Sequence, residues 1–139
     1  MVGATPGVMV DSSVLLDVLT EDPRWFEWSS TSLARAAEDH PLVINPVIYA
    51  EISVRFGRIE DLEAALAEAS LDRRPVPYEA AFLAGKCFVT YRSRGGRRTT
   101  APPDFFIGAH AAVEGWTLLT RDAARFRTYF PRLAVIAPE

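Results

Sequence analysis

The stretch PPDFFIGAHAAVEGWTLLTRD, residues 102–122, holds the most specific pattern in the chain. Asp104 begins a run of small and apolar residues that predicts a helix over residues 104–115. Thr117–Leu119 is a predicted buried strand, and it leads directly into Thr-Arg-Asp. A helix, a short buried strand and a second helix in close succession are typical of α/β proteins with a parallel sheet.

The same alternation extends to both sides of this stretch. Further strands are predicted at Val8–Val10, Leu42–Ile44, Arg74–Val76 and Leu133–Ile136. Helices are predicted between them, at residues 12–19, 24–39, 47–56, 59–71, 78–94 and 122–130. Pro75 and Pro77 make the strand around them short or confine it to a sheet edge. We therefore expect a single domain over residues 1–139, an α/β/α sandwich with a mostly parallel sheet of about five strands.

Four carboxylates follow the predicted strands or begin the helices after them. They are Asp11, Glu51, Asp104 and Asp122. The carboxyl ends of parallel strands meet at one edge of a sheet, so residues far apart in sequence can gather there. Four acids at one edge repel each other unless they share protons or hold a cation, and Mg²⁺ or Mn²⁺ prefers oxygen ligands. This pattern favours a metal-dependent reaction on phosphates.

Each of the three aspartates also has a simpler explanation, because aspartate is a preferred residue at a helix N-terminus. Taken singly, each is better explained as a cap than as a ligand. Glu51 differs, because its helix offers little polar surface around it. A semi-buried carboxylate needs a partner, and a cation is a good candidate. The four acids together favour a site more strongly than any one of them does.

Several segments resemble one known family. The runs VMVDSSVLLDVL, NPVIYAEI, PPDFFIGAHAAVEGWTLLTRD and RFRTYFPRLAVI look like a PIN domain, and they are similar to the VapC-type ribonuclease toxins of bacterial toxin–antitoxin systems. The resemblance covers nearly the whole length. The loop before Asp104 departs from it, since its two prolines and its arginines make it longer and more basic than the family pattern.

The resemblance implies a function and a site. It implies an endoribonuclease that depends on Mg²⁺ or Mn²⁺, inhibited by a cognate antitoxin protein and forming a homodimer. The acidic quartet is Asp11, Glu51, Asp104 and Asp122, with the hydroxyls of Ser13 and Thr120 near it. Mg²⁺ takes only one or two carboxylates directly. We expect Asp11 and Asp104 to be these ligands, with Glu51 and Asp122 acting through bound water or a second ion.

Other chemistries lack their residues. The chain has no glycine-rich dinucleotide or P-loop motif, and its two histidines, His40 and His110, stand alone rather than in a zinc cluster. A haloacid-dehalogenase-type phosphatase needs an aspartate where Ser13 stands. The remaining alternative is a catalytically silent PIN domain that serves as an RNA-binding module or scaffold. Such proteins usually lose one or more of the acids, and this chain retains all four.

Composition sets the remaining expectations. The net charge of −3 does not indicate a nucleic-acid binder, but Arg92, Arg94, Arg97 and Arg98 form a local basic stretch that we expect to hold the RNA backbone, with a solvated loop as the equal alternative. Trp25 and Trp28 give the helix after Pro23 surplus aromatic surface, which predicts a protein interface.

No apolar run approaches the roughly 20 residues of a membrane span, the N-terminus has no basic signal-peptide region, and Cys87 is the single cysteine. These features predict a cytoplasmic protein that does not contact membranes.

Overall fold

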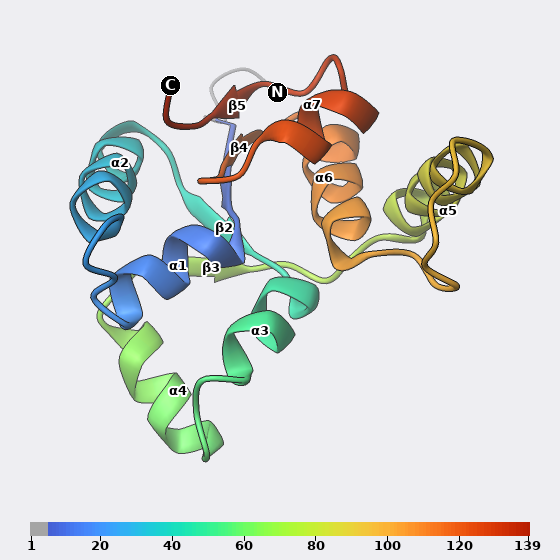
Figure 1. Cartoon of the computed structure of the whole chain (residues 1–139). Helices are drawn as coiled ribbons and strands as arrows, with labels where there is room; N and C mark the ends of the chain where they lie inside the picture. The colour runs from blue at the N-terminus through green and yellow to red at the C-terminus, as the bar shows by residue number, and fades with distance from the viewer. Residues whose placement is uncertain (1–5) are drawn as a thin grey trace.

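The computed structural model describes residues 6–139 of the chain, so residues 1–5 of the expected non-signal N-terminus lie outside the described part. Helices and strands alternate along residues 6–139, with α2 on one side of the sheet and α5 and α6 on the other (Figure 1). The elements are β1 (Val8–Val10), α1 (Ser12–Leu19), α2 (Phe26–Asp39), β2 (Leu42–Ile44), α3 (Pro46–Ser53), α4 (Ile59–Ala67), β3 (Leu71–Arg73), α5 (Tyr78–Ser93), α6 (Pro103–Glu114), β4 (Thr117–Leu119), α7 (Ala124–Tyr129) and β5 (Val135–Ile136).

Within residues 6–139 the strands form one five-stranded sheet in the order β3-β2-β1-β4-β5, and every pairing is parallel. The expected fold class is confirmed. The chain leaves β1 toward β2 and β3, then returns across the sheet to β4 and β5. The strand order therefore reverses between β1 and β4, and the carboxyl ends of these two strands border the crevice where α/β proteins bind their ligands.

The two central strands lie in the core. Val8, Met9 and Val10 of β1 and Leu118 and Leu119 of β4 are each at most 1% exposed. Helices cover both faces of such a sheet, so its central strands are apolar throughout rather than alternating with polar residues. A hydrogen bond from the Asp11 N–H to the Leu119 carbonyl, 2.9 Å long, extends the β1–β4 ladder to the first residue beyond the strand. This hydrogen bond fixes the position of Asp11 at the carboxyl end of β1.

The start of α3 follows its sequence signals. The Asn45 side chain accepts a hydrogen bond from the Ile48 N–H, and Pro46 occupies the first helical position. Asparagine satisfies a helical N–H that has no carbonyl partner, and proline has no N–H to leave unsatisfied there. The predicted start of this helix is confirmed.

The predicted third strand was placed three residues too late. The strand is Leu71–Arg73 rather than Arg74–Val76, although it lies at a sheet edge as expected. Pro75 has no N–H to donate, so the ladder stops after the Arg74 N–H donates to the Ile44 carbonyl. Asp72 and Arg73 are exposed and polar, so this strand has no apolar run by which it could be predicted. The last strand is also shorter than predicted, Val135–Ile136 instead of Leu133–Ile136, because the Leu133 N–H forms a turn with the Phe130 carbonyl.

No helix within residues 6–139 is long and apolar enough to cross a membrane.

Candidate functional site

Asp11, the first residue after β1, is the buried centre of the candidate site. Its side chain is 4% exposed. Oδ2 accepts two hydrogen bonds of 2.8 Å, one from the Ser13 hydroxyl and one from the Thr120 hydroxyl, which comes from the end of β4. Oδ1 is buried and has no hydrogen-bond partner among residues 6–139. A buried carboxylate oxygen without a partner is costly, so Oδ1 is a candidate contact for a cation.

The aspartates are not explained by helix capping. Asp11 precedes α1, but within the described residues its side chain makes no capping hydrogen bond, although the N–H groups of Ser12 and Ser13 approach it. The capping positions of α6 and α7 are occupied by Pro102 and Ala123, so neither Asp104 nor Asp122 is a cap. Helix capping therefore explains none of the three aspartates, although Asp104 lies in the first turn of α6, where the helix dipole favours an acid.

Glu51 reaches the site from α3. It is half-buried, and its Oε1 accepts a 2.8 Å hydrogen bond from the Ser12 hydroxyl at the start of α1. Ser13 was predicted from the sequence, whereas Ser12 was not. The signal was present, because Ser12 directly follows Asp11 and a hydroxyl at the first position of a helix often holds a nearby acid. Ser12 and Ser13 thus serve two different carboxylates.

Asp104 on α6 and Asp122 after β4 complete the acidic group. Asp104 is in the first turn of α6 and half-exposed, and its Oδ2 lies 3.7 Å from Nη1 of Arg125. Asp122 is exposed, and its backbone N–H donates a 3.1 Å hydrogen bond to the Thr120 hydroxyl. The Thr120 hydroxyl therefore donates to Asp11 and accepts from Asp122, which ties the two acidic positions together.

The acids influence one another electrostatically. Burial raises the pKa of Asp11, although hydrogen bonds from Thr120 and Ser13 oppose this effect. Burial also raises the pKa of Glu51, with further contributions from the charges of Asp11 and Asp104. The pKa of Asp104 is raised by burial and by Asp11 and Asp122, while Arg125 and Arg98 lower it. The charges of Asp11 and Asp104 act on Glu51, and those of Asp11 and Asp122 act on Asp104, so the four acids form one electrostatically linked group.

A further ion pair, which was not predicted from the sequence, fixes the loop after β4. Arg121 donates two hydrogen bonds to the buried Asp17 carboxylate, Nε to Oδ2 at 2.8 Å and Nη2 to Oδ1 at 3.0 Å. The Ser29 hydroxyl also donates to Asp17 Oδ2, at 2.7 Å. The Arg121 N–H donates to the Ser13 hydroxyl at 3.2 Å. The available signal was an aspartate among Leu15, Leu16 and Val18 in the first helix, which has to find a partner when buried.

The site fits a hard divalent cation that keeps much of its water. Within residues 6–139, no three His, Cys, Asp or Glu side chains converge to hold a metal ion by themselves. Mg²⁺ does not require such a cage, because it usually binds through one or two carboxylates and retains several waters. The unpartnered Oδ1 of Asp11, together with Asp104 across the crevice, could supply these ligands.

The sequence model of the PIN domain family matches residues 8–131. The chain belongs to the PIN domain family. No curated protein sequence matches the chain closely enough to count as a relative. This PIN domain is similar in structure to VapBC2 from Rickettsia felis bound to a DNA fragment from its promoter, with a TM-score of 0.73 at 18% identity, covering 95% of this chain and 98% of that one.

Two further solved structures have similar folds. VapBC-1 from nontypeable Haemophilus influenzae gives a TM-score of 0.69 at 19% identity, over 94% of this chain and 96% of that chain. FitAcB from Neisseria gonorrhoeae gives a TM-score of 0.64 at 18% identity, over 93% and 96% of the two chains. At these identities the likeness concerns the fold, and it extends over almost the full length of this PIN domain.

The basic stretch of the PIN domain lies on the surface near Asp104. Arg92, Arg94, Arg97 and Arg98 are all exposed. The loop folds back on α5, where the Arg98 N–H donates to the Tyr91 hydroxyl at 3.4 Å and Arg92 Nη1 donates to the Arg98 carbonyl at 2.6 Å. Gly96 packs against the Tyr91 ring so closely that a Cβ would lie 2.2 Å from it. A side chain is therefore excluded at residue 96. Whether the four arginines of this loop bind RNA stays a prediction.

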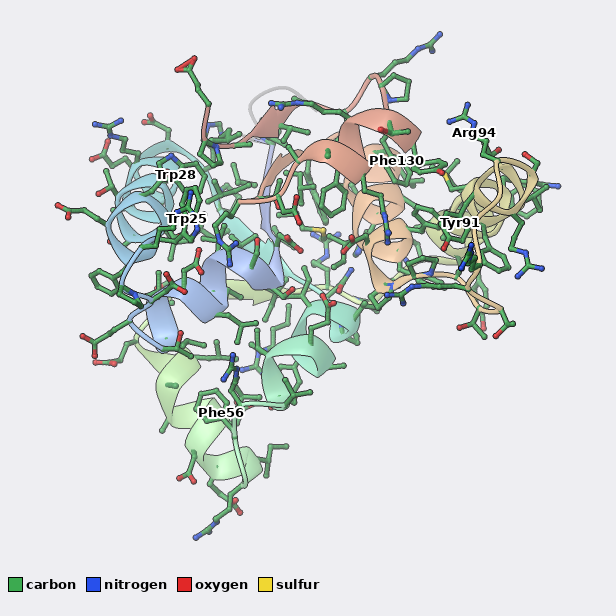
Figure 2. The ribbon with its side chains drawn as sticks, viewed as in Figure 1. Trp25, Trp28, Phe56, Tyr91, Arg94 and Phe130 are labelled. Carbon is green, nitrogen blue, oxygen red and sulfur yellow. The ribbon has the colours of Figure 1, made fainter. Side chains whose placement is uncertain are left out.

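Trp25, just before α2, and Trp28, in its first turn, lie together in the PIN domain, as Figure 2 shows. Their ring centroids are 6.4 Å apart in an edge-to-face arrangement, and both residues are half-buried. Trp28 packs against the core, whereas the guanidinium of Arg121 lies 5.4 Å from the centre of the Trp25 ring. Neither ring is fully buried, so the interface predicted for this helix stays a prediction. Trp25 also touches the ion pair that fixes the site.

His110 is a core residue of α6, fully buried as expected for a histidine outside a metal site. Its Nδ1 lies 3.1 Å from Nδ2 of Asn45, so Asn45 donates and Nε2 carries the proton. That Nε2 has no hydrogen-bond partner in the described part of the chain. Burial lowers the pKa of His110, which keeps the ring neutral.

Proposed function

We propose that this PIN domain is a metal-dependent endoribonuclease, the toxin of a VapBC-like toxin–antitoxin pair, which hydrolyses RNA phosphodiesters. The observation that carries the proposal is the Asp11 carboxylate at the point where the strand order reverses. It is buried, has one unpartnered oxygen, and is surrounded by three further acids. A bound cation would stabilise such a repulsive group of acids.

We assign the direct metal contacts to Asp11 and Asp104, as the sequence predicted. A bound Mg²⁺ or Mn²⁺ would acidify a water molecule and neutralise charge on the phosphoryl oxygens. The hydroxyls of Ser13 and Thr120 both hold Oδ2 of Asp11, which leaves Oδ1 directed to the ligand. Their role is to fix the orientation of the carboxylate before any ligand arrives.

Glu51 and Asp122 differ in environment and therefore in role. Glu51 is half-buried, and the Ser12 hydroxyl holds one of its oxygens, while its pKa is raised chiefly by burial. A carboxylate with a raised pKa is a better proton acceptor near neutral pH, so Glu51 is suited to take a proton from the attacking water. Asp122 is exposed and adds negative charge at the rim, through a bound water or a second ion.

The proposed partners follow from the structural neighbours. Structures described as VapBC complexes share this fold over nearly their whole length. We propose that an antitoxin protein binds this chain and blocks the acidic crevice, and that the free toxin forms a homodimer. The exposed Phe26 beside the two tryptophans of α2 makes that helix our candidate for one of these interfaces.

The proposal is tested with purified protein and mixed single-stranded RNA. Cleavage should require Mg²⁺ or Mn²⁺, stop when EDTA removes the metal, and fall at least about a hundredfold in Asp11→Asn and Asp104→Asn. Asp72→Asn, an exposed acid on the edge strand, is the matched control and should cleave as wild type does. If both site variants cleave RNA normally, the site lies elsewhere. A folded, metal-binding wild type that cuts no RNA would instead favour a silent RNA-binding or scaffold module.

A further inference from the structure

Three arginines lie close enough to the acids to interact with them by charge, and the three differ in their contacts. Arg121 is already bound, because both bonds of its guanidinium fork go to the buried Asp17. Arg98 is exposed on the basic loop, and it acts on Asp104 only through its charge. Arg125, on α7, has its Nη1 3.7 Å from Oδ2 of Asp104. That separation is beyond hydrogen-bond range, so Asp104 holds Arg125 by charge and leaves its donors available.

Two aromatic rings position the Arg125 guanidinium. Its central carbon is 5.9 Å from the ring centre of Tyr91 and 5.9 Å from that of Phe105. Phe105 is fully buried next to Asp104, and the two rings meet edge to face at 5.8 Å. Figure 2 shows Tyr91 on the side of α5 that faces α6. A guanidinium over aromatic rings is attracted to them, which restricts a side chain that would otherwise be free.

We propose that Arg125 binds the scissile phosphate of the RNA substrate. This inference rests on the proposed nuclease function and adds a substrate-binding residue to it. The side chains of Arg125 and Asp104 are each 36% exposed, so a ligand can reach the guanidinium while the rings hold it. A cation on Asp104 would weaken the hold of that carboxylate on Arg125, and the planar fork would then match two phosphate oxygens.

Arg125 is placed where it could stabilise the charge that develops on the phosphate during hydrolysis. It is three residues after Asp122 and lies across from Asp104, so a phosphate contacting it would also lie beside the acids. Hydrolysis adds the oxygen of water to phosphorus and breaks the bond to one ribose oxygen, which leaves with a proton. Negative charge on the non-bridging oxygens grows during this step, and a fixed guanidinium stabilises it.

The test compares Arg125→Ala with Arg127→Ala, a second arginine on α7 that is exposed. Metal-dependent cleavage of a defined single-stranded RNA oligonucleotide should fall about ten- to a hundredfold in kcat/KM for Arg125→Ala, and stay within about twofold of wild type for Arg127→Ala. Arg125→Lys keeps the charge without the fork and should recover only part of the loss. Added guanidinium ion should partly restore Arg125→Ala and have no such effect on Arg127→Ala.

A second measurement does not depend on cleavage. In the Asp11→Asn background, the affinity for the same fluorescein-labelled RNA should fall in Arg125→Ala and not in Arg127→Ala, while thermal unfolding confirms that the variants are folded. If Arg125→Ala cleaves and binds RNA like wild type, the role of Arg125 is overturned and the nuclease function stands. If wild type cleaves no RNA, the nuclease function fails, and unchanged RNA affinity in Arg125→Ala then overturns the role of Arg125 as well.

Discussion

The Thr120 hydroxyl donates a 2.8 Å hydrogen bond to the Asp11 carboxylate across 109 positions of sequence. Thr120 is fully buried at the end of β4, and Asp11 is buried at the end of the neighbouring β1. The same hydroxyl accepts a hydrogen bond from the Asp122 N–H. One threonine therefore sets the orientation of the central acid and the position of a second acid.

We expect Thr120→Val to weaken metal binding and activity without unfolding the protein. Valine has nearly the same shape but cannot donate to Asp11, so one of the two hydroxyls that orient this carboxylate is lost. The expected loss is about ten- to a hundredfold in Mn²⁺ affinity or in cleavage rate, the range seen for groups that hold metal ligands. Thr128→Val is the control, since the Thr128 hydroxyl bonds only a carbonyl of its own helix. Titration of Mn²⁺ binding by calorimetry measures the difference, and equal affinities would contradict this role.

Asp104→Asn should stabilise the metal-free protein at neutral pH. Burial and the charge of Asp11 raise the pKa of Asp104 in the folded state. Between the unfolded and the folded pKa the folded state binds more protons, so the free energy of unfolding falls as pH rises through that window and stays lower above it. Removing the charge removes this penalty, and Tm should rise by a few degrees at pH 7 but not at pH 3. Melting curves at both pH values with EDTA, against Asp72→Asn, test the sign; a lower Tm at pH 7 would contradict it.

Asp17→Asn should destabilise the fold and also lower activity. The substitution breaks a bidentate ion pair in which Asp17 is 2% exposed, and it leaves Arg121 without its charged partner. We expect a loss of about 2–3 kcal/mol in the free energy of unfolding, as for hydrogen bonds to charged groups. Glu60→Gln, which breaks the exposed Arg58–Glu60 pair, should cost less than about 0.5 kcal/mol. Urea unfolding of the two variants compares them directly, and similar losses would show that burial does not matter here.

Neutralising two arginines of the basic loop should weaken RNA binding for all sequences alike. Arg94→Gln with Arg97→Gln removes two exposed charges and leaves the Arg92–Arg98 contact in place. Each lost phosphate contact should reduce the slope of log affinity against log salt by about 1. Arg35→Gln with Arg132→Gln, exposed residues outside this loop, forms the control. An unchanged slope would favour a loop that is merely solvated.

Replacing the aromatic residues of α2 should impair association more than folding. Phe26→Ser removes a side chain that is 39% exposed, and Trp25→Gln removes a half-buried ring. Light scattering should show loss of the homodimer for these variants, whereas Tyr78→Gln, a tyrosine that is 93% exposed on α5, should leave it intact. Cleavage by Trp25→Gln should fall modestly, because that ring also supports Arg121. A dimer that survives both substitutions places the interface on another face.

Most of the fold could be predicted from sequence because its strongest signals are local. Buried strands such as Val8–Val10 are fully apolar, and Asn45 with Pro46 marks a helix start. The third strand was misplaced because an edge strand does not need to be apolar. Its residues Asp72 and Arg73 face solvent, and only hydrogen bonds to β2 define it. Pairing through backbone hydrogen bonds does not require particular side chains, so the sequence does not reveal it.

The acids of the candidate site were also visible in the sequence, but their supporting contacts were not. The positions of Asp11 and Asp122 follow from β1 and β4, neighbouring parallel strands whose carboxyl ends meet at one sheet edge. Ser12 and Arg121 act through partners 39 and 104 residues away, Glu51 and Asp17. Such pairs depend on how α1 packs against α3 and on the loop after β4, and no local pattern encodes that packing.

The central position of β4 determines when the crevice can exist during synthesis. β4 lies beside β1 in the middle of the sheet, but it is among the last strands to leave the ribosome. Until it arrives, β1 has an open edge, Asp11 lacks Thr120, and Asp122 has not been translated. Until residue 122 has been added, a growing chain therefore carries at most three of the four acids and no assembled site. The four acids can therefore gather at one edge of the sheet only after the carboxyl-terminal part of the fold has been synthesised.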